Sequence, residues 1–338
     1  MDAILVKEYR ADIVECVHRG HISIVNDRGK VTHFAGDPHY VSFTRSAAKP
    51  FQAIPGIRAG IAEHYGLNER EIAVMTASHR SEHIHIDTLE TLAKDAGLAE
   101  QSLVCAPSYP LDPSAKEELL RSGGHERRLY HNCSGKHLGV LAYSKMMGYP
   151  MDTYADPSHP VQREILDTFS SFTGVAPQQI GRGTDGCGFP VFAVPISALA
   201  TAYMKLACPD LIEDEATRTA VLRITSAMSQ YPEWVGGTGR VDSVLMKDSN
   251  IIAKCGFKGI YCFALRKERI GICFKIEDGS EEEWGWVVRS ILEQLGYDQT
   301  ETLERLKQAF PHQITNDAGL EVGHAEAVFQ LETAHENN

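Results

Sequence analysis

Long apolar runs are missing from this 338-residue sequence. No stretch approaches the ~20 consecutive apolar residues that a membrane-spanning helix needs. The apolar run near the N-terminus, Ala3 to Val6, is also far shorter than the apolar region of a secretory signal peptide. We therefore expect a cytoplasmic protein that has no membrane partner.

Positive charge is also scarce. The chain has 33 Lys and Arg residues against 45 Asp and Glu residues, which gives a formal net charge of -12. No basic run is longer than two residues, as at Arg127–Arg128. Because nucleic-acid binding depends on clustered Lys and Arg that neutralise phosphates, we expect no nucleic-acid partner.

No Cys-x-x-Cys pair occurs among the cysteines, so the commonest signature of a structural zinc site is absent. The cysteines are Cys16, Cys105, Cys133, Cys187, Cys208, Cys255, Cys262 and Cys273. In a reducing cytoplasm they should remain thiols, and most should be buried as small hydrophobic side chains.

Apolar, β-branched segments lie at both ends of the chain, and amphipathic segments lie between them. The predicted strands are Ile13–Val17, His21–Val25, Val31–Phe34, Ile251–Ala253, Gly259–Leu265 and Ile270–Ile276. The predicted helices are Ser81–Ala96, Cys133–Met147, Val161–Phe172, Asp214–Gln230 and Glu281–Leu295.

This order of elements predicts an α+β fold in a single domain over residues 1–330. An antiparallel sheet would form from about residues 1–45 and 250–330, with a helical region inserted over about 46–250. Two separate sheets are the alternative. Residues 331–338 are expected to form a polar, disordered tail.

The first candidate for chemistry is the Ser-x-x-Lys pair Ser46 and Lys49. On a helix these positions share a face, so the lysine could reach the serine hydroxyl. A serine needs a base to become a good nucleophile, and lysine serves as one where burial or nearby positive charge keeps it neutral. Apolar neighbours and Arg45 could supply both conditions. An N-cap serine beside a surface lysine is the alternative.

Two later positions extend this pattern. Ser78 follows the apolar run Ile72 to Ala77, and Lys254 closes the strand predicted at Ile251 to Ala253. The penicillin-recognising serine enzymes carry Ser-x-x-Lys, a second serine and a Lys-Thr-Gly strand in the same order. Cys255 stands here in place of threonine, which favours a related architecture rather than a β-lactamase.

Two cysteine motifs indicate a metal site. Asn132–His137 (Asn-Cys-Ser-Gly-Lys-His) opens a predicted helix, whose first N–H groups would stabilise a thiolate at Cys133. Gly183–Gly188 contains Cys187 and three glycines, which indicate a bent backbone. Two thiolates suit zinc, and Lys136 could be a third ligand on the same helix face.

Other interpretations of these segments stay open. The two cysteines could be unrelated and buried, or Cys133 could be a nucleophile with His131 or His137 as its base. The histidine-rich run Ser78–His85 differs from the His-Glu-x-x-His metal motif. We expect a solvated first helical turn there, with His79 as its one functional member, a substrate-binding residue.

Together these segments resemble the asparaginase II family, the thermolabile rhizobial type of L-asparaginase. The matching segments are Arg45–Pro50, Ala77–His79, Asn132–His137, Gly183–Cys187, Arg240–Asp242, Lys254–Gly259 and Lys275–Gly279. The two cysteine motifs are specific, whereas the Ser–Lys pair is not. The run Cys255–Lys258 departs from the family, which often has small and acidic residues there.

The resemblance implies a fold similar to serine β-lactamases and glutaminases, and a homodimer. It also implies two Ser–Lys pairs and a zinc site with an aspartate beside it. The pairs would be Ser46–Lys49 and Ser78–Lys254, and the zinc site would use Cys133, Lys136 and Cys187, with Asp185 adjacent.

The expected activity is hydrolysis of L-asparagine to aspartate and ammonia. In this hypothesis Lys49 takes the proton of Ser46, which attacks the side-chain amide carbon. Ser78 and Lys254 would relay protons or assist the second step, and which serine is the nucleophile stays open. No organic cofactor is expected.

The substrate would be a small zwitterion. Arg45 offers a bidentate fork to its α-carboxylate, and Asp185 offers a carboxylate to its α-ammonium group. A surface ion pair is the alternative role for Arg45. For the chain as a whole, the alternatives are a serine hydrolase of another small amide (glutamine or a lactam) and a non-catalytic amino-acid-binding protein.

Overall fold

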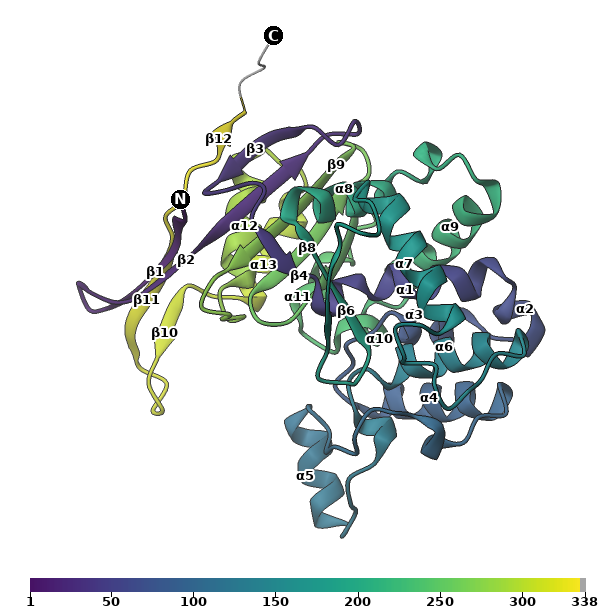
Figure 1. Ribbon diagram of the computed structural model, residues 1–338. Helices are drawn as coiled ribbons and strands as arrows, with labels where there is room; N and C mark the ends of the chain where they lie inside the picture. The colour runs from purple at the N-terminus through teal and green to yellow at the C-terminus, as the bar shows by residue number, and fades with distance from the viewer. Residues whose placement is uncertain (335–338) are drawn as a thin grey trace.

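The two ends of the chain form one curved antiparallel sheet, seen in Figure 1 beside a helical region. The computed structural model describes residues 1–334, and the rest of the predicted polar tail, residues 335–338, lies outside them. The strands of this sheet are β1 (Ala3–Arg10), β2 (Ile13–Val25), β3 (Val31–Ala35), β7 (Ile251–Cys255), β8 (Ile260–Leu265), β9 (Ile270–Ile276), β10 (Gln313–Thr315), β11 (Glu321–Ala327) and β12 (Glu332–Thr333).

The strand order is β10-β11-β1-β2-β9-β8-β7, and β3 pairs with both β2 and β12. N-terminal β2 therefore lies directly against C-terminal β9, which confirms the predicted α+β class with a sheet shared by both chain ends. The two strands predicted at Ile13–Val17 and His21–Val25 are one strand, because the ladder continues through Gly20 from β1 to β9. The start of the predicted tail is ordered, since Glu332 and Thr333 pair with β3.

The inserted region is mostly helical. Its helices are α1 (Lys49–Arg58), α2 (Ile61–Tyr65), α3 (Glu69–Met75), α4 (His83–Asp95), α5 (Pro113–Arg121), α6 (Ser134–Met146), α7 (Pro160–Thr173), α8 (Ile196–Ala207), α9 (Glu215–Gln230), α10 (Pro232–Gly236) and α11 (Val241–Leu245). Short 3-10 helices are η1 (Arg45–Ala48), η2 (Glu100–Ser102), η3 (Arg128–Tyr130) and η4 (Pro209–Leu211), and after the sheet follow α12 (Trp284–Gln294) and α13 (Thr300–Ala309).

A second, three-stranded sheet that the sequence did not predict joins a strand before the helical region to two strands within it. This sheet has the order β4-β6-β5, from β4 (Val41–Phe43), β5 (Gly181–Thr184) and β6 (Pro190–Pro195). The glycine-rich composition of β5 hides its strand character from sequence reasoning, since glycine has low β propensity.

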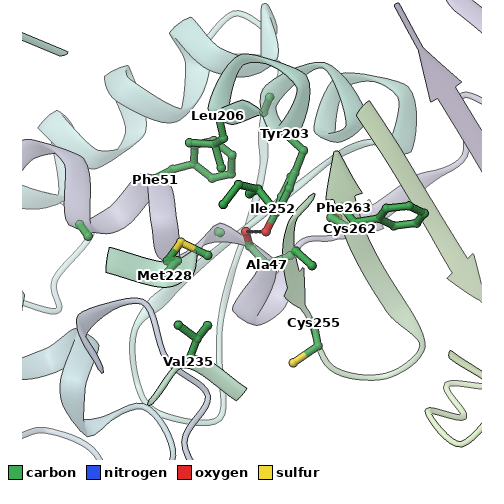
Figure 2. Packing of buried hydrophobic residues seen from close by; sticks show 14 of the residues in the cluster. Ala47, Phe51, Tyr203, Leu206, Met228, Val235, Ile252, Cys255, Cys262 and Phe263 are labelled. Carbon is green, nitrogen blue, oxygen red and sulfur yellow. Dashed lines mark hydrogen bonds between the residues drawn. The ribbon is translucent and has the colours of Figure 1, made fainter. Parts of the chain in front are cut away.

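The apolar helix α8 joins the helical region to the large sheet. It contacts β2, β8 and β9, and it approaches β9 closely at Gly271, where an added Cβ would lie 2.0 Å from the carbonyl oxygen of Ala200. Figure 2 shows the core beside this contact, where the Tyr203 hydroxyl donates a hydrogen bond of 2.7 Å to the carbonyl of Ala47. This packing ties α8 to η1, the segment that carries Ser46.

Helix α1 is central to the helical region, and all its residues except Arg58 are buried. It contacts α6, α7 and α9. Because neighbouring helices surround α1, Lys49 at its first position is buried as well. None of the helices described over residues 1–334 has the length and apolar character that a membrane crossing requires.

Candidate active site

The small sheet brings Arg45 and Asp185 together. Strand β4 runs into η1, and Thr44 at the junction donates its backbone N–H to Phe192 of β6. Asp185 begins the turn between β5 and β6, which closes through its own N–H and the carbonyl of Phe189. As a result, Arg45 Nη2 lies 2.6 Å from Asp185 Oδ1.

A cavity of about 330 Å³ opens beside this ion pair. Its wall contains residues from the β7–β8 turn, η1, the β5–β6 turn and the start of α6. The lining residues are Arg45, Ser46, Ser108, Leu111, His131, Asn132, Cys133, Asp185, Gly186, Cys187, Gly256 and Phe257. Half of the predicted site residues (Arg45, Ser46, Cys133, Asp185 and Cys187) therefore line one cavity.

Burial makes Lys49 a candidate base. Its side chain is 1% exposed, and desolvation lowers its pKa, with the charges of Lys254 and Lys136 acting in the same direction. Lys49 Nζ donates to the carbonyl oxygens of Ala77 and Asn132, at 2.5 and 3.3 Å. These acceptors hold the amine in place.

Ser78 lies between two lysines. Its Oγ is 3.2 Å from Lys49 Nζ and 2.9 Å from Lys254 Nζ. Its backbone N–H donates to Val235 of α10, which fixes the loop after α3. Lys49 and Lys254 thus approach one hydroxyl from α1 and from β7.

Lys254 is held as a cation. Its Nζ lies 3.4 Å from Asp242 Oδ2, and both side chains are almost fully buried. Although burial opposes the charge, the Cys255 thiol and the Asp242 carboxylate raise the pKa of Lys254. Asp242 also accepts the backbone N–H of Cys255 at 2.8 Å. The two lysines therefore differ, because Lys254 is paired with a carboxylate and Lys49 is not.

Ser46 and Lys49 are not joined as their spacing suggests. Lys49 reaches Ser78 instead, and the Ser46 hydroxyl makes no hydrogen bond within residues 1–334. The reason is local: Ser46 and Lys49 lie in a 3-10 turn, where Lys49 N–H bonds to Ser46 O, and the lysine continues into α1. Ser46 is 7% exposed and faces the cavity.

The two cysteine motifs also meet. Cys133 is the N-cap residue of α6, close to its predicted position at the helix start. An added Cβ on Gly135 would lie 2.1 Å from the Val74 carbonyl oxygen, so this glycine lets α6 pack against the end of α3. Cys187 comes from the β5–β6 turn, and Lys136 Nζ lies 3.1 Å from its Sγ. All three predicted metal ligands are buried.

The chemistry of this donor set fits zinc. A hydrogen bond from the Cys187 thiol, with the charges of Lys49 and Lys136, holds the pKa of Cys133 well below its usual value. The same contact raises the pKa of Cys187. Burial opposes the charge of Lys136, but the adjacent Cys187 and Cys133 sulfurs raise its pKa. Two sulfurs and an amine could hold zinc if Lys136 and Cys187 gave up their protons.

His79 is not in a solvated helical turn, and that prediction is wrong. The side chain is 0% exposed, and α4 begins only at His83 because Ser81 has a positive φ of 62°. His79 Nε2 donates to Ser134 Oγ at 2.8 Å, and its Nδ1 accepts the N–H of Ser81. It therefore ties the Ser78 loop to α6 and does not line the cavity.

The two histidines near Cys133 differ in whether they line the cavity. His137 is buried and bonds the Tyr154 hydroxyl through Nδ1 at 2.7 Å. His131 lines the cavity and accepts the backbone N–H of Cys133 at 3.1 Å. Of the two, only His131 therefore reaches the cavity, and its Nδ1 lone pair already accepts the Cys133 backbone N–H.

Sequence reasoning gave no role to Asp242 or Phe257. Asp242 lies in the segment Arg240–Asp242, and its pairing with Lys254 depends on the contact between α11 and β7. Phe257 follows β7 at the position where the sequence departs from the expected family pattern. The guanidinium of Arg45 lies 5.2 Å from the centre of its ring.

Comparison with solved structures finds distant likenesses. The chain is similar to a β-lactamase from Mycobacterium bovis at 11% identity and a TM-score of 0.44, over 81% of this chain and 94% of that one. It is also similar to Mglu in its L-glutamate binding form, at 17% identity and a TM-score of 0.37, over 82% of this chain and 59% of that one. These scores are too low to carry an argument about chemistry.

Comparison with curated proteins finds no match. In contrast, residues 6–327 match the family described as L-asparaginase II, and this range includes every candidate site residue. The chain belongs to the L-asparaginase II family.

Proposed function

We propose that this protein hydrolyses L-asparagine to L-aspartate and ammonia by nucleophilic serine catalysis. Family membership supports an amidohydrolase. The observation that carries the proposal is the position of Ser46 on the cavity wall, next to the Arg45–Asp185 pair. A serine hydroxyl and two opposite charges at one cavity suit an amino-acid amide.

The ion pair would recognise the substrate's backbone groups. The α-carboxylate binds Arg45, whose Nε is buried and makes no hydrogen bond within the described residues. The α-ammonium group binds Asp185. A zwitterion between them replaces one ion pair with two, which offsets the loss of the Arg45–Asp185 contact. The substrate's side chain then extends along the wall toward Ser46.

Ser46 is the proposed nucleophile. Its oxygen attacks the amide carbon, and its proton passes to the neutral amine of Lys49, directly or through Ser78. The backbone N–H of Ser46 is the proposed donor to the oxyanion, since the first N–H groups of a helix lack helical partners. The C–N bond breaks, the nitrogen takes a proton and leaves as ammonia, and an aspartyl ester on Ser46 remains.

Ser78 and Lys254 supply the proton handling. The Lys254 ammonium, held by Asp242, keeps a positive charge beside the Ser78 hydroxyl. Ser78 can accept a proton from one lysine and donate one to the leaving nitrogen. Water then attacks the ester, with Lys49 as base, and releases aspartate.

Zinc is proposed as a resident of the same cavity. Cys133, Lys136 and Cys187 would hold it, with Asp185 beside them. When bound, it would supply a Lewis-acid centre in the cavity wall. The serine chemistry itself uses only the chain's own residues.

The test is ammonia release from asparagine, with glutamine and a β-lactam as competing substrates and Ser46→Ala as the inactive control. Release from asparagine that is lost in Ser46→Ala supports the proposal. Release only from glutamine or opening of the lactam would assign a different amide. Saturable asparagine binding without any ammonia would instead indicate an amino-acid-binding protein.

We also propose a cytoplasmic homodimer. The outer half of β2 exposes Ile13, Val14 and Val17, beyond the cover of the helices. A second copy would shield these side chains from water. Reducing conditions would keep Cys262 and Cys273, whose sulfurs are 3.5 Å apart, as thiols. The molecular mass in solution tests the dimer, and Val14→Asp should favour the monomer.

A further inference from the structure

A histidine and two glutamates meet on the large sheet. His18 lies on β2, Glu8 on β1 and Glu283 immediately before α12. Their ligand atoms lie within 4.8 Å of one another. The side chain of Glu283 is 1% exposed, and those of His18 and Glu8 are 13% and 18% exposed. None of the three lines the candidate active-site cavity, and the proposed hydrolysis does not use them.

An outer carboxylate fixes the orientation of His18. Its Nδ1 lies 2.7 Å from Asp278 Oδ2, a short distance for a hydrogen bond between a ring N–H and a carboxylate. With Nδ1 as the donor to Asp278, Nε2 faces Glu8 and Glu283 and is free to bind a metal. A carboxylate that orients a metal-binding imidazole in this way is a recurrent outer partner in metal sites.

The inner atoms of the cluster lack hydrogen bonds. His18 Nε2 and Glu283 Oε2 are buried and have no hydrogen-bond partner among the described residues. A buried polar atom without a partner is costly, so such atoms call for an explanation. Glu283 Oε1 accepts the Ser280 hydroxyl at 2.9 Å, which holds the carboxylate in place and leaves Oε2 unused.

The distances suit an ion better than hydrogen bonds. His18 Nε2 lies 3.3 Å from Glu283 Oε1 and 3.7 Å from Glu8 Oε1. Both exceed the usual N–H···O range of about 2.7–3.2 Å. Two ligands that are each ~2.1 Å from a tetrahedral ion are ~3.4 Å apart. The two distances from His18 Nε2 are therefore close to those between neighbouring ligand atoms around one metal ion.

We propose that Glu8, His18 and Glu283 form a second metal site, which binds a divalent transition-metal ion such as Mn²⁺ or Zn²⁺. One imidazole and two carboxylates are ligands that both ions accept. The ion would join β1, β2 and the start of α12, three segments that are far apart in the sequence. It is a structural site, independent of the cysteine-rich cavity.

Manganese is the chosen probe because it favours carboxylates and disfavours the thiols of the active-site cavity. Metal-free protein is titrated with Mn²⁺, and the free ion is followed by electron paramagnetic resonance. We expect the wild type to bind about one equivalent that Glu283→Gln does not bind. Glu277→Gln is the matched control, since Glu277 pairs with His21 at 2.9 Å on the same sheet and should bind Mn²⁺ as the wild type does.

Thermal unfolding supplies a second measurement. Mn²⁺ should raise the Tm of the wild type and of Glu277→Gln, and leave that of Glu283→Gln unchanged, because an ion that binds only the native state stabilises it. If Glu283→Gln does not fold, the more exposed Glu8→Gln replaces it. Equal binding by wild type and variant, or no binding by the wild type up to about 1 mM Mn²⁺, would overturn the proposal. The cluster would then be a group of polar side chains without a metal.

Discussion

Arg45 and Asp185 lie 2.6 Å apart on the wall of the cavity, although 140 positions separate them in the chain. Arg45 adopts a positive φ of 49°, a region that costs a non-glycine residue about 1–3 kcal/mol. The adjoining β4–β6 pairing holds it there. In the proposed function, the charges of this pair bind the two charged backbone groups of the substrate.

Arg45→Ala should raise the KM for asparagine roughly 10–100-fold, since a hydrogen bond to a charged group contributes ~1.5–3 kcal/mol. The kcat should change much less, because Arg45 binds the substrate away from the reacting carbon. Steady-state kinetics give both constants. Arg182→Ala, an exposed arginine on β5, is the matched control. A KM equal to that of the wild type would remove the carboxylate role.

Lys49→Met should lower kcat by roughly 10²–10⁴-fold, as expected for loss of a general base. It should also stabilise the fold. Burial lowers the pKa of Lys49. Between this lowered pKa and 10.5, the unfolded chain carries a proton on Lys49 that the folded chain does not. The free energy of unfolding of the wild type therefore rises with pH over this range. The Tm of Lys49→Met should therefore exceed that of the wild type most at a pH below the lowered pKa. The difference should fade as the pH approaches the ordinary lysine pKa of 10.5.

Thermal unfolding of Lys49→Met and the wild type across pH 6–10, below the ordinary lysine pKa, measures how the difference in Tm changes with pH. A stabilisation that grows with pH would contradict a buried, neutral Lys49. Lys145→Met, which removes a lysine that bonds the carbonyls at the end of α4, offers a control without a buried amine.

Asp242→Asn should destabilise the fold by about 3–5 kcal/mol, because it leaves the buried Lys254 cation without its carboxylate. Burial opposes ionisation of Asp242, but Lys254 and the Cys255 N–H lower its pKa. The stabilisation is therefore present above the ordinary pKa of 3.8 and is lost as the pH falls through the lower, folded value. Denaturant unfolding at neutral pH measures the loss.

The double variant Asp242→Asn/Lys254→Met separates the charge effect from simple loss of packing. It should be more stable than Asp242→Asn alone, since no unpaired charge remains. Additive losses in the two single variants would indicate that the pair is not coupled.

Zinc binding should release protons. Lys136 and Cys187, whose pKa values are raised by the surrounding sulfurs, must lose their protons before they can bind a metal. Adding zinc to metal-free protein in weak buffer should acidify the solution, and Cys187→Ser should reduce both the acidification and the bound zinc. Cys208→Ser, a buried cysteine outside the cavity, is the control. Unchanged zinc content in Cys187→Ser would remove that residue from the site.

Much of the fold follows from local patterns. Strands β7, β8 and β9 begin and end within a few residues of their apolar runs, and α9 begins after the capping Asp214, as expected. Local patterns did not predict β5, whose strand conformation depends on tertiary contacts. Its glycines form a strand only because β6 pairs with them.

Of the two Ser–Lys pairs that the sequence predicts, the structure has Ser78–Lys254, at 2.9 Å, but not Ser46–Lys49. Spacing and the family resemblance both placed Lys49 beside Ser46. The structure places it on Ser78, because the loop after α3 returns to the start of α1. Asp242 could not be assigned from the sequence, since its contact with Lys254 depends on how α11 packs against β7.

The most direct test of the central claim is to find the acyl-enzyme. The protein is mixed with asparagine, quenched in acid within the first turnover, digested and analysed by mass spectrometry. The account predicts one aspartyl group on the peptide that contains Ser46, and none in Ser46→Ala. An aspartyl group on the peptide of Ser78 or Cys133 instead, with Ser46→Ala still active, would contradict it.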